Sequence, residues 1–415
     1  MRPLVSICCA TYNHDKYISQ ALDGFLSQKG DFDIEILIHD DASTDQTASI
    51  IAEYVKQYPD IIFPIYQHEN QYSKGVRTSL FNYERCRGDF IAICEGDDFW
   101  TDKNKLAIQV DALLLHSEYD LCLHSAILQH VFQDKPDEII CKYSYCPIIS
   151  TQHNNSLGFD VDVRVIPTSD VIVRKEWMHP TASTVLTKRA LSKYISFMRD
   201  RPWLPVGDLY LHILPSLQTG ALYIDREMSV YRYMTDFSWT KRIMGGAIDK
   251  LIHHNNLVVD SYNELNELTN GVYEKYFAGA IRKRLSVIYA ACYYDNIKWQ
   301  QLADNFYQKA MRLLDSLPED NYIVYGASDF FFKNHKKIPG AISFIVDRNH
   351  NLDGQVIDGF KVYTLDKLKI CPRQKIIICV LGRAVDVRDI LVNDYNVFER
   401  DIIDFDSCFE DECLR

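Results

Sequence analysis

The stretch Phe90-Ile-Ala-Ile-Cys-Glu-Gly-Asp-Asp98 decides the fold, because a continuous apolar run of strand length ends in a cluster of acids. Apolar runs of the same kind occur at Leu4–Ala10, Ile34–His39 and Ile61–Tyr66. Between the first two runs, residues Asp15–Gln28 carry apolar side chains at helical spacing. Strands that alternate with helices at this density predict βαβ units, and therefore an α/β fold with a mostly parallel sheet flanked by helices.

Composition narrows the function classes. The chain has 415 residues, enough for two or three domains. Its 45 basic and 57 acidic residues give a net charge of −12, which argues against nucleic acid as a binding partner. Since no apolar run reaches about 20 residues, we expect no spanning helix and at most peripheral membrane contact. The start lacks a signal-peptide pattern and the twelve cysteines lack metal-ligand spacing, which favours a cytoplasmic protein, at most at the inner face of the cell membrane.

Three zones follow one another along the chain. Residues 1–240 are predicted to form one domain, with a less regular part from about 125. Residues 241–318 carry apolar stripes at helical spacing and end at Pro318, which predicts a helical linker domain. Strand-like runs return at Tyr322–Tyr325, Ala341–Val346 and Lys375–Leu381, which predicts a small α/β domain over 319–415.

Polar residues follow three of the predicted strands where each strand ends. They are Thr11-Tyr12-Asn13, then Asp40-Asp41, then Glu95-Gly96-Asp97-Asp98. Because the carboxyl ends of parallel strands share one edge of a sheet, we expect these residues to meet in a ligand site. Acids gathered there repel one another, and a divalent cation relieves that repulsion. Carboxylates without His or Cys suit Mg²⁺ or Mn²⁺, so we expect a nucleotide diphosphate bridged by such a metal.

Each acidic segment also has a structural interpretation. Asp40-Asp41 is compatible with a turn into a helix that has Ser43 as its N-cap and ends near Tyr58. Glu95–Asp98 alone is compatible with a solvated turn. Both segments lie at predicted strand ends of one βα array, and this favours the ligand site.

Three segments together resemble the family 2 glycosyltransferases of the GT-A fold, over roughly residues 3–240: Val5–Asn13, Ile38–Asp45 and Gly88–Trp100. These are bacterial enzymes that build capsule, O-antigen or other surface polysaccharide. The resemblance implies a nucleotide-sugar donor, usually a UDP-sugar, a divalent metal ion and inversion at the anomeric carbon. By match to the family's motifs, Thr11, Tyr12 and Asn13 line the nucleotide site, Asp41 contacts the uracil, Asp97 lies near the ribose, and Asp98 coordinates the metal. Glu95 stands where many members have Asp, which keeps the charge beside the donor and acceptor.

The resemblance places the general base in the stretch Trp203-Leu-Pro-Val-Gly-Asp208. Burial in this apolar setting would raise the pKa of the Asp208 carboxyl and improve it as a base. A helix N-cap is the structural alternative. His179 and Arg232 are candidates for contacts with donor or acceptor, with a structural histidine and a structural salt bridge as their alternatives.

The stretch Tyr322-Ile-Val-Tyr-Gly326 resembles the first strand of small Rossmann-like modules. A dinucleotide site needs further glycines there, but Phe330, Phe331 and Phe332 follow, so we expect no dinucleotide. At least one of these phenylalanines should point into the module's core or contact the helices of 245–316. We therefore favour a role in packing or assembly, including a homo-oligomer through the helical or C-terminal region.

The sequence thus favours a metal-dependent inverting glycosyltransferase that moves a sugar from a nucleotide-sugar to a glycan or lipid-linked acceptor. The alternative is a non-catalytic nucleotide-sugar-binding or assembly subunit on the same fold, because a fold alone does not imply activity.

Overall fold

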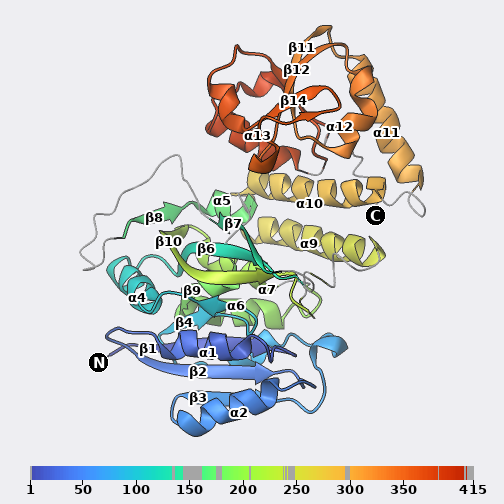
Figure 1. Cartoon of the computed structure of the whole chain (residues 1–415). Helices are drawn as coiled ribbons and strands as arrows, with labels where there is room; N and C mark the ends of the chain where they lie inside the picture. Colours follow the sequence, from blue (N-terminus) through green and yellow to red (C-terminus); the bar gives the residue numbers. More distant parts are fainter. Residues whose placement is uncertain are drawn as a thin grey trace. The chain divides into compact units, whose positions relative to one another are not determined.

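The computed structural model describes residues 2–132, 136–143, 161–173, 180–204, 207–236, 238, 241, 248–294, 300–381, 383–405 and 408. The chain divides into two compact units, Met1–Gly246 and Ala247–Arg415 (Figure 1). Each unit has its own sheet and its own core. The helices and C-terminal strands of the second unit form one compact body, so the boundary near residue 318 stays a prediction. Within the described residues, no helix is both long and apolar enough to cross a membrane.

The first unit is built on one mixed sheet. Its strands are β1 (Leu4–Thr11), β2 (Asp33–Asp40), β3 (Ile62–Tyr66), β4 (Phe90–Ile93), β5 (Phe99–Trp100), β6 (Leu121–His130), β7 (Glu138–Tyr143), β8 (Val163–Ile166), β9 (Val185–Thr187) and β10 (Ala221–Tyr233). The order is β3-β2-β1-β4-β9-β6-β10-β5, with β7 on β6 and β8 on β10. The first four strands are parallel, whereas β9 and β5 run antiparallel to their neighbours. The predicted α/β fold is confirmed, and its parallel part is the half that the acidic motifs occupy.

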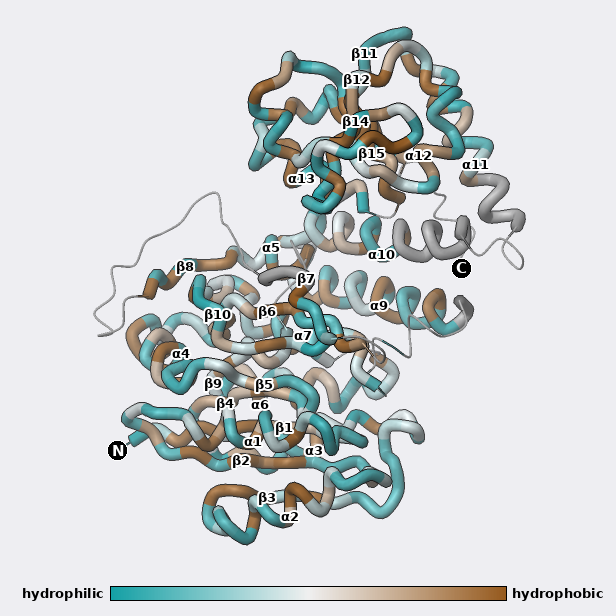
Figure 2. The backbone as a smooth tube through the Cα atoms, in the orientation of Figure 1, coloured by the Kyte–Doolittle hydropathy of each residue, from teal (hydrophilic) through white to brown (hydrophobic). Residues whose placement is uncertain are grey.

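Helices cover this sheet on both faces. They are α1 (Ile18–Leu26), α2 (Thr47–Gln57), α3 (Ser79–Tyr83), α4 (Lys105–Leu115), α5 (Thr168–Val173), α6 (Lys188–Arg199) and α7 (Gly207–Ser216). Figure 2 shows that hydrophobic residues follow the strands. The prediction that Ser43 is an N-cap is wrong. Helix α2 begins at Thr47, whose N–H donates to Asp45, while the Ser43 hydroxyl donates to Asp40.

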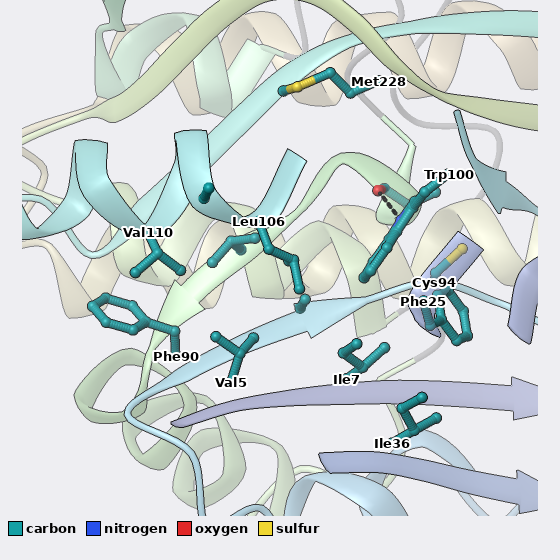
Figure 3. Close-up of a cluster of buried hydrophobic side chains, with 14 of the residues drawn as sticks. Val5, Ile7, Phe25, Ile36, Phe90, Cys94, Trp100, Leu106, Val110 and Met228 are labelled. Carbon is teal, nitrogen blue, oxygen red and sulfur yellow. Dashed lines mark hydrogen bonds between the residues drawn. The ribbon is translucent and has the colours of Figure 1, made fainter. Parts of the chain in front are cut away.

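A buried lysine lies in the core behind the acidic turn. The Lys105 side chain is 0% exposed, and its Nζ donates to Gln109 Oε1 at 2.8 Å and lies 4.2 Å from the centre of the Trp100 ring. Burial lowers the pKa of Lys105 to about 7. The Trp100 ring packs on Phe25 at 4.7 Å, and its indole N–H donates to Ala182 O at 3.0 Å (Figure 3). The core therefore fixes the strand that follows the acidic turn.

The second unit combines helices α9 (Ile248–Leu268), α10 (Glu274–Tyr294) and α11 (Gln300–Asp315) with a smaller sheet. The sheet has the order β13-β14-β12-β11-β15-β16 and is parallel except for β13. Its strands are β11 (Asp320–Tyr325), β12 (Gly340–Val346), β13 (Val356–Ile357), β14 (Phe360–Tyr363), β15 (Lys375–Ile378) and β16 (Ile402–Ile403), and its helices are α12 (Asp329–Asn334) and α13 (Ala384–Asn393).

The phenylalanines after Gly326 point into this unit's core, as predicted. Phe330 and Phe331 are each 1% exposed. The Phe330 ring lies 6.0 Å from Phe306 of α11 and 4.7 Å from Phe405. The contact between the C-terminal strands and the preceding helices is therefore confirmed. Within 241–318 the sequence predicts one helical stripe that contains Trp299, Leu302, Phe306, Ala310 and Leu313, and of these Trp299 lies outside the described residues.

Candidate active site

Three strand ends meet at one edge of the first sheet, as the motifs predicted. Thr11 at the end of β1 pairs with Asp40 at the end of β2. Beyond the strands, Asp41 N–H donates to Thr11 O at 3.0 Å and Gly96 N–H donates to Ala10 O at 2.9 Å. The residues after β1, β2 and β4 are therefore direct neighbours.

Asn13 joins the first strand end to the second. It has a φ of 56°, in the left-handed region that asparagine tolerates. Its backbone N–H donates to Ser43 Oγ at 2.9 Å, and its Oδ1 accepts from Thr44 N–H at 2.8 Å. Thr11 is buried and Tyr12 is half-buried beside it. The contact of Thr11, Tyr12 and Asn13 with a nucleotide stays a prediction. The hydrogen bonds to Ser43 and Thr44 fix the backbone at Asn13.

Asp41 anchors the segment that follows β3. Its carboxylate oxygens accept from Gln71 N–H at 2.8 Å and Tyr72 N–H at 3.0 Å, and the side chain is buried. Each carboxylate oxygen can accept a further hydrogen bond, so these contacts leave room for the predicted contact with a base. The structure thus adds a second role, in which Asp41 fixes a loop at this edge.

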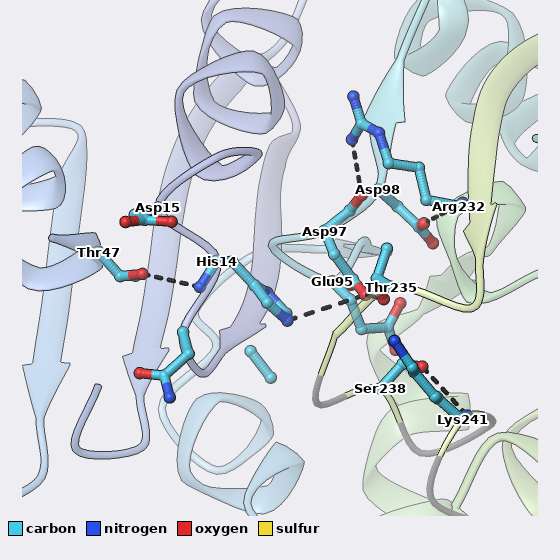
Figure 4. Close-up of polar contacts among 12 residues, drawn as sticks. His14, Asp15, Thr47, Glu95, Asp97, Asp98, Arg232, Thr235, Ser238 and Lys241 are labelled. Atoms are coloured by element: carbon cyan, nitrogen blue, oxygen red, sulfur yellow. Dashed lines mark hydrogen bonds and ion pairs between the residues drawn. The ribbon is translucent and has the colours of Figure 1, made fainter. Parts of the chain in front are cut away.

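Arg232 donates hydrogen bonds to both residues of the turn Asp97–Asp98. Its backbone N–H donates to Asp98 Oδ1 at 2.8 Å, and its guanidinium donates to Asp97 O at 2.6 Å and to the Gln20 side chain (Figure 4). The Thr235 hydroxyl donates to Asp97 Oδ2 at 2.7 Å. Asp98 is 1% exposed and Asp97 is 9% exposed. The end of strand β10 and the residues just after it therefore cover the acidic turn with a cation and a hydroxyl from far along the chain.

The Arg232 guanidinium lies between two aromatic rings. Its carbon Cζ is 4.9 Å from the centre of the Tyr17 ring and 4.4 Å from that of Phe99. Burial lowers the pKa of Arg232, while the charges of the neighbouring acids raise it. Since the guanidinium is held by protein acceptors and rings, its described contacts are structural, and its predicted contact with donor or acceptor stays a prediction.

Burial and mutual repulsion raise the pKa values of two acids of the turn, Glu95 and Asp98. Burial and the charge of Asp97 raise the pKa of Glu95 to about 7. A hydrogen bond from the Thr181 hydroxyl acts in the opposite direction. Burial and the charges of Asp97 and Glu95 raise the pKa of Asp98 well above its ordinary value, against the Arg232 cation. A ligand that brings positive charge or donors would relieve this repulsion.

Asp208 acts electrostatically on the acidic turn. It lies in the first turn of α7, where its Oδ1 accepts from Leu209 N–H at 2.9 Å, so it is not the residue that caps the helix. Its charge contributes to the raised pKa of Glu95, which puts the two carboxylates within electrostatic reach of each other. The role of Asp208 as the general base stays a prediction. His179, the remaining predicted contact, lies outside the described residues.

His14 makes a polar contact to Asp97 that no sequence motif indicated. His14 Nε2 lies 3.8 Å from Asp97 Oδ2, and the ring is buried (Figure 4). Gly96 must be glycine in this arrangement, because a Cβ there would lie 2.6 Å from Thr11 Oγ1 and 3.1 Å from His14 Nδ1. The only signal was position, since His14 directly follows the first motif.

The donor set fits a divalent cation that is bound together with a diphosphate. Within the described part of the chain, no group of three or more His, Cys, Asp or Glu is arranged to hold a metal alone. Mg²⁺ in such sites takes one or two carboxylates and fills its shell with phosphate and water oxygens. Asp98, whose pKa is raised by burial and by the charges of Asp97 and Glu95, is the carboxylate that would fit such a minimal set.

Known proteins match the unit that carries this site. Residues 6–142 match the family model described as glycosyl transferase family 2. An uncharacterised protein of Mycobacterium tuberculosis is 31% identical over 236 residues, which are 57% of this chain and 60% of that relative. The dTDP-rhamnosyl transferase RfbG of Shigella flexneri is 33% identical over 110 residues, 26% of this chain and 37% of that relative. S. aureus TarS, solved with UDP, matches with a TM-score of 0.43 and 14% identity over 73% of this chain and 91% of that one.

Proposed function

We propose that the chain transfers a sugar from a nucleotide-sugar to an acceptor hydroxyl, and the match of residues 6–142 to the family 2 glycosyltransferase model supports this. We propose a UDP-sugar as donor, inversion at the anomeric carbon, and a glycan or lipid-linked acceptor in the synthesis of a bacterial surface polysaccharide. The name of the Shigella relative specifies a dTDP-sugar, so a donor panel should contain both pyrimidine nucleotides.

The observation that supports this proposal is the acidic turn Glu95–Asp98 at the strand edge beside Thr11 and Asp41, together with the electrostatic effect of Asp208 on Glu95. Asp208 comes from α7 and the turn from the end of β4, yet the charge of Asp208 acts on Glu95. Inverting transfer needs one base on the acceptor side and a stabilised leaving group on the donor side. We propose that the two acidic elements supply these two sides of one reaction.

In the proposed reaction, Asp208 takes the proton of the acceptor hydroxyl while its oxygen bonds to the anomeric carbon. The bond from that carbon to the diphosphate breaks, and its electron pair leaves with the diphosphate. Thr11, Asn13 and Asp41 would position the nucleoside at the strand edge. A divalent cation held by Asp98 would stabilise the negative charge that develops on the leaving diphosphate.

The substitution Asp208→Asn tests the base. The two side chains are nearly isosteric, so we expect turnover to fall by about 10²–10⁴-fold with UDP affinity unchanged. Donor hydrolysis and transfer are measured with a panel of UDP-, dTDP- and GDP-sugars. The matched control is Asp200→Asn, an exposed aspartate after α6, which should behave like the wild type. Turnover within threefold of the wild type in Asp208→Asn would assign the base to another residue.

A non-catalytic nucleotide-sugar-binding subunit is the second candidate. It shares the strand-edge site but needs no base. In that case UDP with Mn²⁺ would raise the melting temperature, while no donor of the panel would be hydrolysed or transferred and Asp208→Asn would change nothing.

A further inference from the structure

Arg77 joins two parts of the site that are far apart in the sequence. It lies between the segment anchored by Asp41 and helix α3, and its Nη2 donates to Leu204 O at 2.6 Å. This acceptor precedes α7, the helix that begins at Gly207. The hydrogen bond spans 127 positions along the chain.

The same guanidinium lies beside the first turn of α7. A Cβ on Gly207 would lie 3.5 Å from Arg77 Nη1 and 2.7 Å from Tyr194 Oη. The Tyr194 hydroxyl therefore leaves no room for a Cβ on Gly207, while Arg77 Nη1 lies at van der Waals distance from the start of α7. Because Asp208 is the next residue, its position depends on these two side chains.

Charged and titratable groups from three elements face this turn. They are Arg77 before α3, Tyr194 of α6 and Glu95 after β4. Burial raises the pKa of the Tyr194 phenol, the Arg77 cation lowers it, and the Asp208 charge raises it. Among these groups Arg77 is the cation, and it lies beside the Tyr194 phenol and the start of α7.

We infer that Arg77 is a positioning residue for Asp208, which fixes the first turn of α7 against the segment held by Asp41 and favours the ionised carboxylate. The inference rests on the proposed role of Asp208 as base. It adds a physical link between the two sides of the site, because the Arg77 segment begins where Asp41 accepts from Gln71 and Tyr72. Displacing that segment displaces the base.

The substitutions Arg77→Gln and Arg77→Lys separate charge from geometry. Arg77→Gln should move the acid limb of the kcat/KM profile up by about one pH unit and lower kcat by about 10²-fold through misplacement of the base. Arg77→Lys should restore the acid limb but not kcat, because an ammonium keeps the charge and loses the two-armed contact. The matched control is Arg199→Gln, an exposed arginine of α6 paired with Glu84, which should change neither.

Two further measurements decide the inference. In an Asp208→Asn background, Arg77→Gln should have no additional effect on rate, whereas a general structural role would lower the rate further. The affinity for UDP with Mn²⁺ should stay the same. Weaker UDP binding with an unmoved acid limb would make Arg77 a donor ligand and overturn the inference.

A measurement that does not depend on turnover separates the test of Arg77 from the test of Asp208 as the base. The difference in melting temperature between the wild type and Asp208→Asn, followed against pH, has a midpoint set by the Asp208 carboxyl. Repeating the pair in the Arg77→Gln background should move that midpoint to higher pH. If the midpoint stays in place, the inference fails even where Asp208 is the base; if Asp208→Asn stays active but the midpoint moves, only the proposed base fails.

Discussion

Replacing the buried Lys105 by methionine should stabilise the first unit at neutral pH and lose that advantage in alkali. Burial lowers the pKa of Lys105 from 10.5 to about 7. In this range the unfolded chain holds a proton that the folded chain has released. The stability of the wild type therefore rises as the pH rises from about 7 to about 10.5. Below that window the folded chain bears the full cost of the buried charge.

The size of the effect follows from the shift. At about 1.4 kcal/mol for each pKa unit, the cost below pH 7 is about 5 kcal/mol. A unit of this size changes its melting temperature by about 2–4 °C for each kcal/mol, so the difference between variant and wild type should change by about 10–20 °C across the window. The lost hydrogen bond to Gln109 costs the same at every pH, so the pH dependence isolates the charge. Methionine keeps the contact with the Trp100 ring.

The assay is thermal unfolding of both chains at half-unit steps from about pH 6 to about pH 10. Lys56→Met on the exposed face of α2 is the matched control, and its difference from the wild type should be flat. A Lys105→Met difference that is equally flat would show that the lysine keeps its ordinary protonation in the fold and would refute the reasoning.

Two predictions concern the metal and the second unit. Asp98→Ala should abolish transfer while the melting temperature holds or rises, since its neighbours oppose its charge; full activity in excess EDTA would contradict the metal dependence. Phe330→Ala should destabilise the second unit by about 3–5 kcal/mol, because it leaves a cavity in the core, and it should leave UDP binding unchanged. The control is Phe398→Ala, at a half-exposed phenylalanine. Unchanged thermal unfolding of Phe330→Ala would contradict the place of Phe330 in the core.

The parallel half of the first sheet could be predicted because its strands are continuous apolar runs. A parallel strand is buried on both faces, so its sequence is apolar throughout and ends abruptly at polar residues. That is why Glu95–Asp98 marked the strand end correctly. Residues 125–240 gave no such signal. There the strands are antiparallel or mixed, and β10 changes its register to β6 between Ile224 and Ser229.

The contacts that complete the site could not be predicted, because they join distant positions. Arg77 meets Leu204, and Thr235 meets Asp97, through folds of the chain that no local pattern encodes. Ser43 shows the converse problem. Its position suits a helix cap, but the competing acceptor Asp40 takes its hydroxyl in the folded chain.

The hydrogen bond from Arg232 to Asp98 spans 134 positions, so the acidic turn is made long before the strand that closes it. During synthesis, domains fold from the N-terminus as the chain emerges. A nascent chain that reaches residue 142, where the family match ends, already holds Glu95, Asp97 and Asp98 but neither Arg232 nor Thr235. It also holds β5 and β6 without β10, the strand that lies between them in the sheet, and such open edges invite pairing with other chains. We expect a ribosome-released fragment of 142 residues to aggregate, and one that continues through Thr235 to remain dispersed.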